Sequence, residues 1–172
     1  LCAQDLVETK RAALHAAADA GKVVLGVCGG YQLLGHGYEL GDREIPGAGL
    51  VDLRTVRSDG PRLIGNVAIE VDLDGAGPRV LAGFENHAGR THLGAGERPL
   101  GRVLAGHGNT GESGHEGVRR ANVIGTYLHG PLLPKNAWFA DWLIRAATGL
   151  DELEPLDDAL EDAAHARARE LA

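Results

Sequence analysis

The stretch that decides the fold is Lys22-Val-Val-Leu-Gly-Val-Cys-Gly-Gly-Tyr-Gln-Leu-Leu-Gly35. Its first part is a short, mostly apolar run, which is typical of a buried parallel strand over residues 22–27. A turn at Cys28-Gly-Gly30 then leads into a short helix that continues through Leu34 and stops at Gly35. A strand, a tight turn and a helix in direct succession indicate an α/β protein.

Cys28 lies where a nucleophile elbow places its reactive residue, on the sharp turn between a strand and a helix. Bulky residues two positions away on either side would collide in such a strained turn, and the sequence has Gly26 and Gly30 there. The turn sets the sulfur at a helix N-terminus, whose dipole favours the thiolate. It also directs the amide of Gly29 into the same space as an oxyanion donor. A buried core cysteine is the alternative, but the two flanking glycines favour the nucleophile.

The flanking sequence fits the same fold class. In chain order we expect a helix over residues 5–20, strands over 62–71, 79–85, 100–105 and 118–128, a helix from Pro134 to Ala147, and a surface helix in the acidic tail. Residues 106–117 are polar and rich in glycine, so we expect an exposed loop, where functional groups often lie. Residues 1–150 are expected to form the functional domain, with 151–172 as a helical tail of that domain.

Composition narrows the class of protein. The chain has 172 residues, of which 44% are hydrophobic and 24% charged, as in ordinary globular domains. A net charge of -7 argues against nucleic-acid binding, and no apolar run has the length of a membrane span. The two cysteines are too few for a disulfide framework and suit a reducing compartment. These features predict a cytoplasmic protein.

A cysteine nucleophile needs a base, which is usually a histidine. His129 is the leading candidate among eight histidines, because it ends the apolar strand Val123–Leu128 and is followed by Gly130-Pro131. Sites in α/β sheets form at the carboxyl ends of strands, where Cys28 and His129 would both lie; a capping or packing role for His129 is the alternative. His87 is the second candidate, in a segment that has the character of a site-lining or structural loop.

The other histidines are expected at solvent-facing positions. His15 and His165 fall in predicted helices remote from any loop, and His36, His92, His107 and His115 fall in glycine-rich loops. They lack the tight paired spacing of a zinc site, so no metal site is predicted.

Three segments carry a family resemblance. The segment Gly26–Gly35 resembles the nucleophile segment of class I glutamine amidotransferases, in the branch shared with the cobyric acid synthases. Gly83-Phe-Glu-Asn-His-Ala-Gly-Arg-Thr91 and Gly125-Thr-Tyr-Leu-His-Gly-Pro-Leu-Leu-Pro134 extend the resemblance. Gly106-His-Gly-Asn, followed by Glu116-Gly117, narrows it to the glutaminase subunits of lipid II isoglutaminyl synthases, the GatD type. The resemblance implies a flavodoxin-like mixed sheet flanked by helices.

The resemblance also implies a mechanism and its residues. Cys28 would attack the side-chain amide of glutamine, and His129 would act as general base and acid. Arg62 lies where the family places an arginine that holds the glutamine α-carboxylate, a task that suits the two parallel hydrogen bonds of a guanidinium. An exposed charge at a strand edge is the alternative for Arg62.

The resemblance further implies a partner. Ammonia would pass to a Mur-ligase-like synthetase subunit, which uses ATP to amidate the D-glutamate of lipid II to D-isoglutamine. ATP and metal would belong to that partner, and this chain would carry no cofactor; it has no Gly-x-x-x-x-Gly-Lys-[Ser/Thr] phosphate loop. The glutaminase domain of a cobyrinate or cobyric acid amidating enzyme is the alternative. A cysteine peptidase or deglycase with the same elbow would not be expected to show the segment from Phe84 to Thr91 or the Leu-His-Gly-Pro ending. A binding module with an inert cysteine is the non-enzymatic alternative.

Two features depart from the family pattern. Many class I amidotransferases carry a glutamate two residues after the histidine, and here that position is Pro131. The site is therefore expected to be a Cys–His dyad unless another acid orients His129. The family also has strands and a glycine-rich oxyanion loop before the helix at residues 5–20, and we expect these to precede residue 1.

Overall fold

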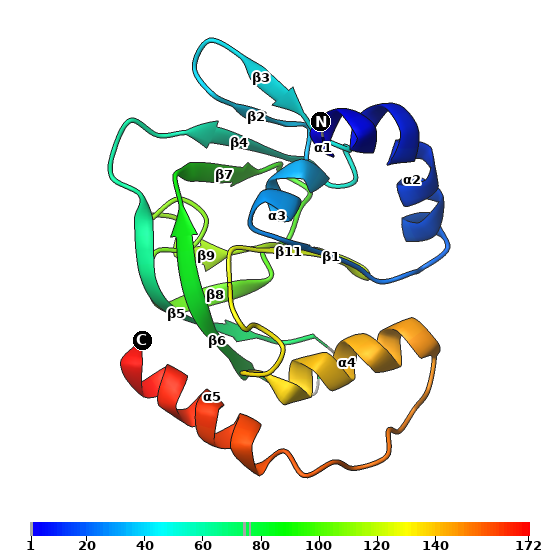
Figure 1. Ribbon diagram of the computed structural model, residues 1–172, viewed down its shortest axis with the longest axis vertical. Helices are drawn as coiled ribbons and strands as arrows, with labels where there is room; N and C mark the ends of the chain where they lie inside the picture. The colour runs from blue at the N-terminus through cyan, green and yellow to red at the C-terminus, as the bar shows by residue number, and fades with distance from the viewer. Residues whose placement is uncertain (1, 74, 76) are drawn as a thin grey trace.

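The computed structural model describes residues 2–73, 75 and 77–172, with residue 2 described by its backbone alone. Its strands form three sheets, in the orders β1-β11-β10, β3-β2-β4-β7 and β6-β5-β8-β9 (Figure 1). The strands are β1 (Val24–Val27), β2 (Gly37–Glu39), β3 (Glu44–Pro46), β4 (Leu53–Arg57), β5 (Leu63–Val71), β6 (Arg79–His87), β7 (Gly89–Leu93), β8 (Gly101–Ala105), β9 (His115–Glu116), β10 (Val118–Arg120) and β11 (Val123–Thr126). The helices are α1 (Cys2–Asp5), the π-helical η1 (Leu6–Lys10), α2 (Arg11–Asp19), α3 (Gly29–Leu34), α4 (Ala137–Thr148) and α5 (Ala159–Leu171). Mixed sheets and helices confirm the predicted α/β class.

The sheet that holds the site is built around β11. Strand β1 pairs with β11 in parallel, with Val27 opposite Thr126, which confirms the predicted parallel strand. Strand β10 pairs with β11 on the other side, antiparallel. The prediction of one strand over 118–128 is therefore wrong: the chain reverses at Ala121, whose φ is +52°. No glycine or proline marks this reversal in the sequence, so the run of strand-favouring residues predicted one continuous strand.

The other two sheets contain strands that the sequence did not reveal. The predicted strands at 62–71, 79–85 and 100–105 are present as β5, β6 and β8, and β6 continues two residues further, to His87. Strands β2, β3, β4, β7 and β9 were not predicted. They are short, and charged residues alternate with buried ones in β4, so hydrogen bonding to neighbouring strands rather than a long apolar run defines them.

The helices flank the sheets much as predicted. The helix expected at 5–20 is present as the continuous run α1–η1–α2, and Gly21 follows it with φ +74°. Helix α4 begins at Ala137 rather than at Pro134, because the backbone of Asn136 is not helical (φ −142°, ψ 63°). The buried side chain of Asn136 accepts from Ala82 N at 2.9 Å and donates to Leu132 O at 2.7 Å. Gly149 ends α4 in the left-handed conformation.

The acidic tail forms α5, which lies across β5 and β6 on the side of the molecule that also holds α4 (Figure 1). Asn66 Nδ2 on β5 donates to Leu171 O at 2.8 Å near the end of this helix. None of the described helices is long and apolar enough to cross a membrane. The strands expected before residue 1 lie outside the described residues.

Two apolar cores meet at β11. Ile124 and Leu128 belong to a core with Ile69, Leu81 and Phe139, which packs β11 against β5, β6 and α4. Val123 and Tyr127 belong to a second core, which packs the other side of β11 against α3 and β4. Because alternate side chains of a strand point to opposite faces, the carboxyl end of β11 is fixed from both sides.

Candidate active site at the ends of β1 and β11

The elbow at Cys28 has the backbone that the sequence predicts. Cys28 has φ +52° and ψ −107°, a conformation that non-glycine residues rarely adopt, and α3 begins directly after it. Its N–H donates to Thr126 O at 2.9 Å, which ties the turn to β11. A Cβ on Gly26 would lie 2.8 Å from Leu34 Cδ1 and 3.0 Å from the carbonyl of Gly30, so position 26 requires glycine. A Cβ on Gly30 would meet nothing within 4 Å, so the predicted requirement for glycine there is wrong.

The charge environment of Cys28 differs from the expectation. Burial of the half-buried thiol raises its pKa above the usual 9.0. The Gly29 N–H, which bonds toward the sulfur, and the positive charge of Arg62 both lower the pKa, but burial is the largest influence. The helix N-terminus was expected to favour the thiolate, but burial outweighs the influences that lower the pKa of Cys28. The helix α3 has only six residues, so its dipole is weak.

His129 leaves the sheet at the same edge as Cys28, one strand away. Because Val27 pairs with Thr126, the residues that follow β1 and β11 emerge side by side. The His129 N–H donates to Phe84 O at 2.7 Å, which also ties this segment to β6. Its Nε2 is buried and has no hydrogen-bond partner among the described residues. Burial lowers the pKa of His129 below 6.5, and the nearby His87 lowers it further.

Arg62 lies just before β5 and is held by the end of β6. Its Nε donates to Asn86 Oδ1 at 2.8 Å and its Nη2 donates to Asn86 O at 3.0 Å. The side chain is exposed, and its charge acts on Cys28. The structure thus places Cys28, Gly29, Arg62 and His129 around one region, from three segments that are far apart in the sequence.

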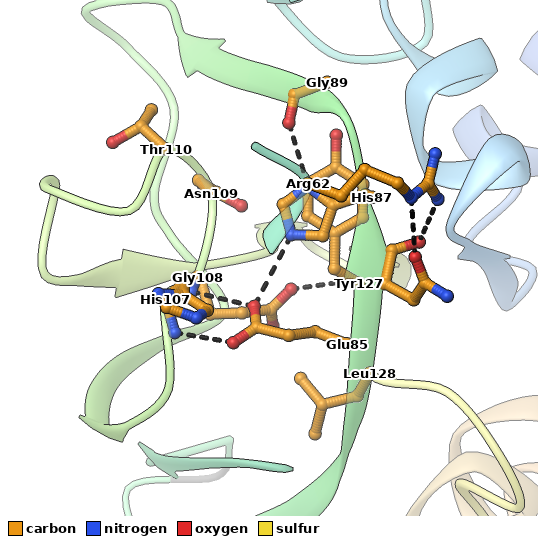
Figure 2. A network of polar contacts seen from close by, with 12 residues as sticks. Arg62, Glu85, His87, Gly89, His107, Gly108, Asn109, Thr110, Tyr127 and Leu128 are labelled. Atoms are coloured by element: carbon orange, nitrogen blue, oxygen red, sulfur yellow. Dashed lines mark hydrogen bonds and ion pairs between the residues drawn. The ribbon is translucent and has the colours of Figure 1, made fainter. Parts of the chain in front are cut away.

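Several buried polar residues on β6 and in the segment 106–117 could not be predicted from the sequence. His87 was expected in a loop, but it is the last residue of β6. It is buried there, and its ring stacks on the Tyr127 ring with ring centroids 3.5 Å apart. Its neighbour Glu85 is completely buried and accepts from the backbone N–H groups of His107 at 2.6 Å and Gly108 at 3.0 Å (Figure 2). These contacts join residues that are distant in the sequence, so no local pattern could show them.

The segment 106–117 is only partly the exposed loop that was expected. Asn109 and Glu116 are buried in it. Glu116 Oε1 accepts from Tyr127 N at 2.6 Å, and Oε2 accepts from the Thr126 hydroxyl at 2.9 Å. Asn109 Oδ1 accepts from the Tyr31 hydroxyl at 3.1 Å. Polar residues of this segment therefore form internal hydrogen bonds, and not all of them face the solvent.

The remaining histidines are only partly at solvent-facing positions. His15 and His165 are half-buried against loop carbonyls, with ring nitrogens 2.9 Å from Ala48 O and 2.8 Å from Lys135 O, so the expectation for these two is wrong. His36 is exposed and lies 3.1 Å from an oxygen of Asp52. The described residues contain no group of three side chains suited to holding a metal ion.

The fold matches that of known amidotransferases. A solved glutamine amidotransferase superposes with a TM-score of 0.53 and 18% sequence identity, over 81% of this chain and 68% of that chain. This likeness shows the fold alone.

Two curated relatives show which branch the chain resembles. The GatD subunit of the glutamine-hydrolysing lipid II isoglutaminyl synthase of Staphylococcus aureus (strain N315) is 44% identical over 135 residues, which is 78% of this chain and 53% of that protein. A probable cobyric acid synthase of Methanothermobacter thermautotrophicus is 35% identical over 148 residues, 78% of this chain and 29% of that protein. The chain thus spans about half the length of the first relative and less than a third of the second.

A family model agrees with these relatives. The model of the CobB/CobQ-like glutamine amidotransferase domain matches residues 3–137, a range that includes Cys28, Arg62 and His129. The match confirms the branch predicted from the motifs. The chain belongs to the family of CobB/CobQ-like glutamine amidotransferase domains.

Proposed function

We propose that this chain hydrolyses glutamine and supplies the ammonia for amidation of lipid II, as the glutaminase part of a lipid II isoglutaminyl synthase. The observation that carries the proposal is the strained elbow at Cys28, beside the segment that ends in His129. The identity of 44% to a GatD subunit supports the choice of pathway.

The proposed chemistry divides into two stages. Cys28 gives its thiol proton to His129, and its sulfur attacks the side-chain amide carbon of glutamine, with the Gly29 N–H donating to the oxygen that becomes negative. The C–N bond then breaks, His129 returns the proton to the leaving nitrogen, and ammonia departs. Water next attacks the glutamyl thioester with His129 as base, which releases glutamate and restores the thiol.

The pKa directions support a neutral resting pair. Burial raises the pKa of Cys28 and lowers that of His129, so a neutral thiol would face a neutral imidazole at pH 7. A neutral imidazole can accept a proton, which is what a base in this position must do. The buried and unpartnered Nε2 of His129 is the atom available for the transfer.

Arg62 is proposed to hold the α-carboxylate of glutamine. Its charge acts on Cys28, so a carboxylate paired with Arg62 would bring the rest of the glutamine close to the sulfur. The bonds to Asn86 use Nε and Nη2, and among the described residues no bond engages Nη1, which stays available for a carboxylate oxygen. Asn86 fixes the guanidinium in advance, which lowers the entropy cost of binding.

The rest of the reaction is proposed to lie on other parts of the enzyme. A Mur-ligase-like synthetase subunit would use ATP and a metal ion to activate the D-glutamate of lipid II, while this chain would need no cofactor. The assembly would work in the cytoplasm, and residues 151–172 would belong to the same domain as 1–150, since α5 packs on β5 and β6.

A glutaminase domain of a cobyric acid synthase is the second candidate, supported by the identity of 35% to a protein of that name. The two candidates share the chemistry of glutamine and differ in the ammonia acceptor. The lower identity makes this candidate the weaker of the two.

The test uses the full-length protein with a Mur-ligase-like synthetase, glutamine, ATP and lipid II. We expect glutamate release and amidated lipid II, and we expect Cys28→Ala and His129→Ala each to abolish both. His92→Ala, at an exposed position on β7, is the matched control and should keep full activity. Glutamate release by the Cys28→Ala variant would refute the site. Amidation of cobyrinic acid instead of lipid II would support the second candidate.

A further inference from the structure

Arg62, the proposed clamp for the α-carboxylate, lies on a short connection between two sheets. Strand β4 of one sheet ends at Arg57 and strand β5 of another begins at Leu63, so residues 58–62 join them. This segment is mostly exposed and forms no helix or strand. Ordering a loose loop when a ligand binds costs free energy. A clamp at this place therefore depends on contacts that fix the segment beforehand.

A second stretch of chain passes between the same two sheets beside the first. Strand β6 ends at His87 and β7 begins at Gly89, so only Ala88 separates them. His87 pairs with the first residue of β5, and Gly89 pairs with the last residue of β4. The Ser58 N–H donates to Ala88 O at 3.2 Å. The corner 87–89 thus lies directly along the segment 58–62 that carries the clamp.

Arg90, the second residue of β7, binds both stretches of chain. Its Nη2 donates to Pro61 O at 2.9 Å, and its Nη1 donates to Ala88 O at 3.1 Å. One planar guanidinium therefore bonds a carbonyl on each side, a task that suits the rigid fork of donors in arginine. Pro61 comes directly before Arg62, so the bond from Arg90 acts on the backbone that carries the clamp.

The side chain of Arg62 is held separately, by the residue before the corner 87–89. Asn86 Oδ1 accepts from Arg62 Nε at 2.8 Å, and Asn86 O accepts from Nη2 at 3.0 Å (Figure 2). Asn86 thus fixes the guanidinium of Arg62, while Arg90 fixes the backbone directly before it. Since the charge of Arg62 acts on Cys28, the place of the segment 58–62 determines how the clamp lies relative to the thiol.

We propose that Arg90 is a positioning residue for glutamine binding: its bond to the Pro61 carbonyl fixes the segment 58–62 and so keeps Arg62 in place for the α-carboxylate. The inference rests on the proposed function, since Arg62 is the proposed clamp. Arg90 acts through Arg62 and does not touch glutamine. Cys28 and His129 lie on other segments, so loss of the Arg90 bonds should weaken binding and leave the chemical steps nearly unchanged.

The first test is the steady-state kinetics of Arg90→Met in the full-length protein with its synthetase. Methionine keeps most of the apolar stem and removes the donors, which limits the loss of packing. We expect KM for glutamine to rise by about threefold or more, with kcat changed by less than about twofold. Arg57→Ala, which removes an exposed cation at the end of β4, is the matched control and should leave both constants unchanged. A native KM in Arg90→Met, or a loss confined to kcat, would overturn the proposal.

A double variant distinguishes positioning from direct binding. If Arg90 acts only through Arg62, Arg90→Met should raise KM in the native background and have no further effect in the Arg62→Ala background, because residues that act as a unit are not additive. A further rise of the same size in the Arg62→Ala background would overturn the proposal, since Arg90 would then bind glutamine itself or act on the fold as a whole.

Hydrogen exchange of the segment 58–62 tests the same role without turnover. The N–H groups of Ser58 and Gly60 bond to Ala88 O and to the Ser58 hydroxyl. We expect both to exchange faster in Arg90→Met than in the native protein or in Arg57→Ala. Unchanged exchange would refute the inference even if glutamine hydrolysis is fully confirmed. Failure of the proposed function would instead show as missing glutamate release by the native enzyme, with the difference in exchange intact.

Arg90→Lys carries the test if Arg90→Met does not fold. Lysine keeps the stem and the charge, but its compact ammonium lacks the fork that bonds two carbonyls at once. We expect KM and the exchange rate to rise in Arg90→Lys, by less than in Arg90→Met. If Arg90→Met is unfolded, native values of both in Arg90→Lys would overturn the proposal.

Discussion

At the scale of single residues, Arg62 gives the most specific test of how glutamine binds. Replacing it with alanine removes the proposed contact to the α-carboxylate, which exists in both the ground state and the transition state. We therefore expect Arg62→Ala to raise KM for glutamine by about tenfold or more, with a smaller change in kcat. Steady-state glutamate release measures both constants.

A second arginine provides the control for that experiment. Arg102 on β8 is exposed and pairs with Glu70 at 2.9 Å, away from the proposed site. Arg102→Ala should leave KM unchanged. If Arg62→Ala behaves like Arg102→Ala, the guanidinium does not bind glutamine.

The candidate site residues that could be predicted from the sequence are those whose signals are local. Cys28 and His129 each follow a strand, and glycines or a proline beside them mark the end of regular structure. Glu85 and Glu116 carried no such mark, because the contacts that bury them reach His107 and Tyr127, 22 and 11 residues away. The charge state of Cys28 was also out of reach, since the extent of burial is a property of the folded molecule.

At the scale of elements, the elbow between β1 and α3 offers two glycines that should respond differently. A Cβ on Gly26 would collide with Leu34 and with the backbone of Gly30, so α3 would have to shift relative to β1. We expect Gly26→Ala to destabilise the fold by about 1–3 kcal/mol and to reduce glutamine hydrolysis. Urea unfolding and the glutaminase assay measure the two effects.

Gly30→Ala is the control within the same turn. Its Cβ would enter open space, and alanine is a better helix former than glycine, so stability should stay the same or rise slightly. Equal losses in Gly26→Ala and Gly30→Ala would show that the close approach at position 26 does not decide the geometry of the elbow.

The elements that the sequence predicted are those whose pattern is long or sharply bounded. Strands β5 and β6 pair over nine residues each, and their apolar runs are clear in the sequence. Strands β2 and β3 have three residues each, and pairing with neighbouring strands defines them: β3 is at the edge of its sheet and β2 lies between β3 and β4. The reversal at Ala121 was missed because its positive φ follows from the pairing of β10 with β11 rather than from its residue type.

At the scale of the whole molecule, the buried carboxyl of Glu116 ties the site to the stability of the fold. Glu116 holds Thr126 and Tyr127 by hydrogen bonds, at the point where the two cores meet across β11. Burial raises its pKa from 4.5 to about 8. Between these values the folded state keeps a proton that the unfolded state has lost, so the stability of the native protein falls as the pH rises through this window.

Glu116→Gln removes this dependence, because an amide resembles the protonated acid and does not titrate. The native protein should therefore lose stability relative to Glu116→Gln between pH 5 and pH 8, by roughly 2 kcal/mol or more. Urea unfolding at several pH values gives the difference, and the titration of all other groups cancels in it. Glu112→Gln, in the exposed part of the loop 106–117, should track the native protein at every pH. A constant difference between the native protein and Glu116→Gln would mean that Glu116 is ionised in the folded state.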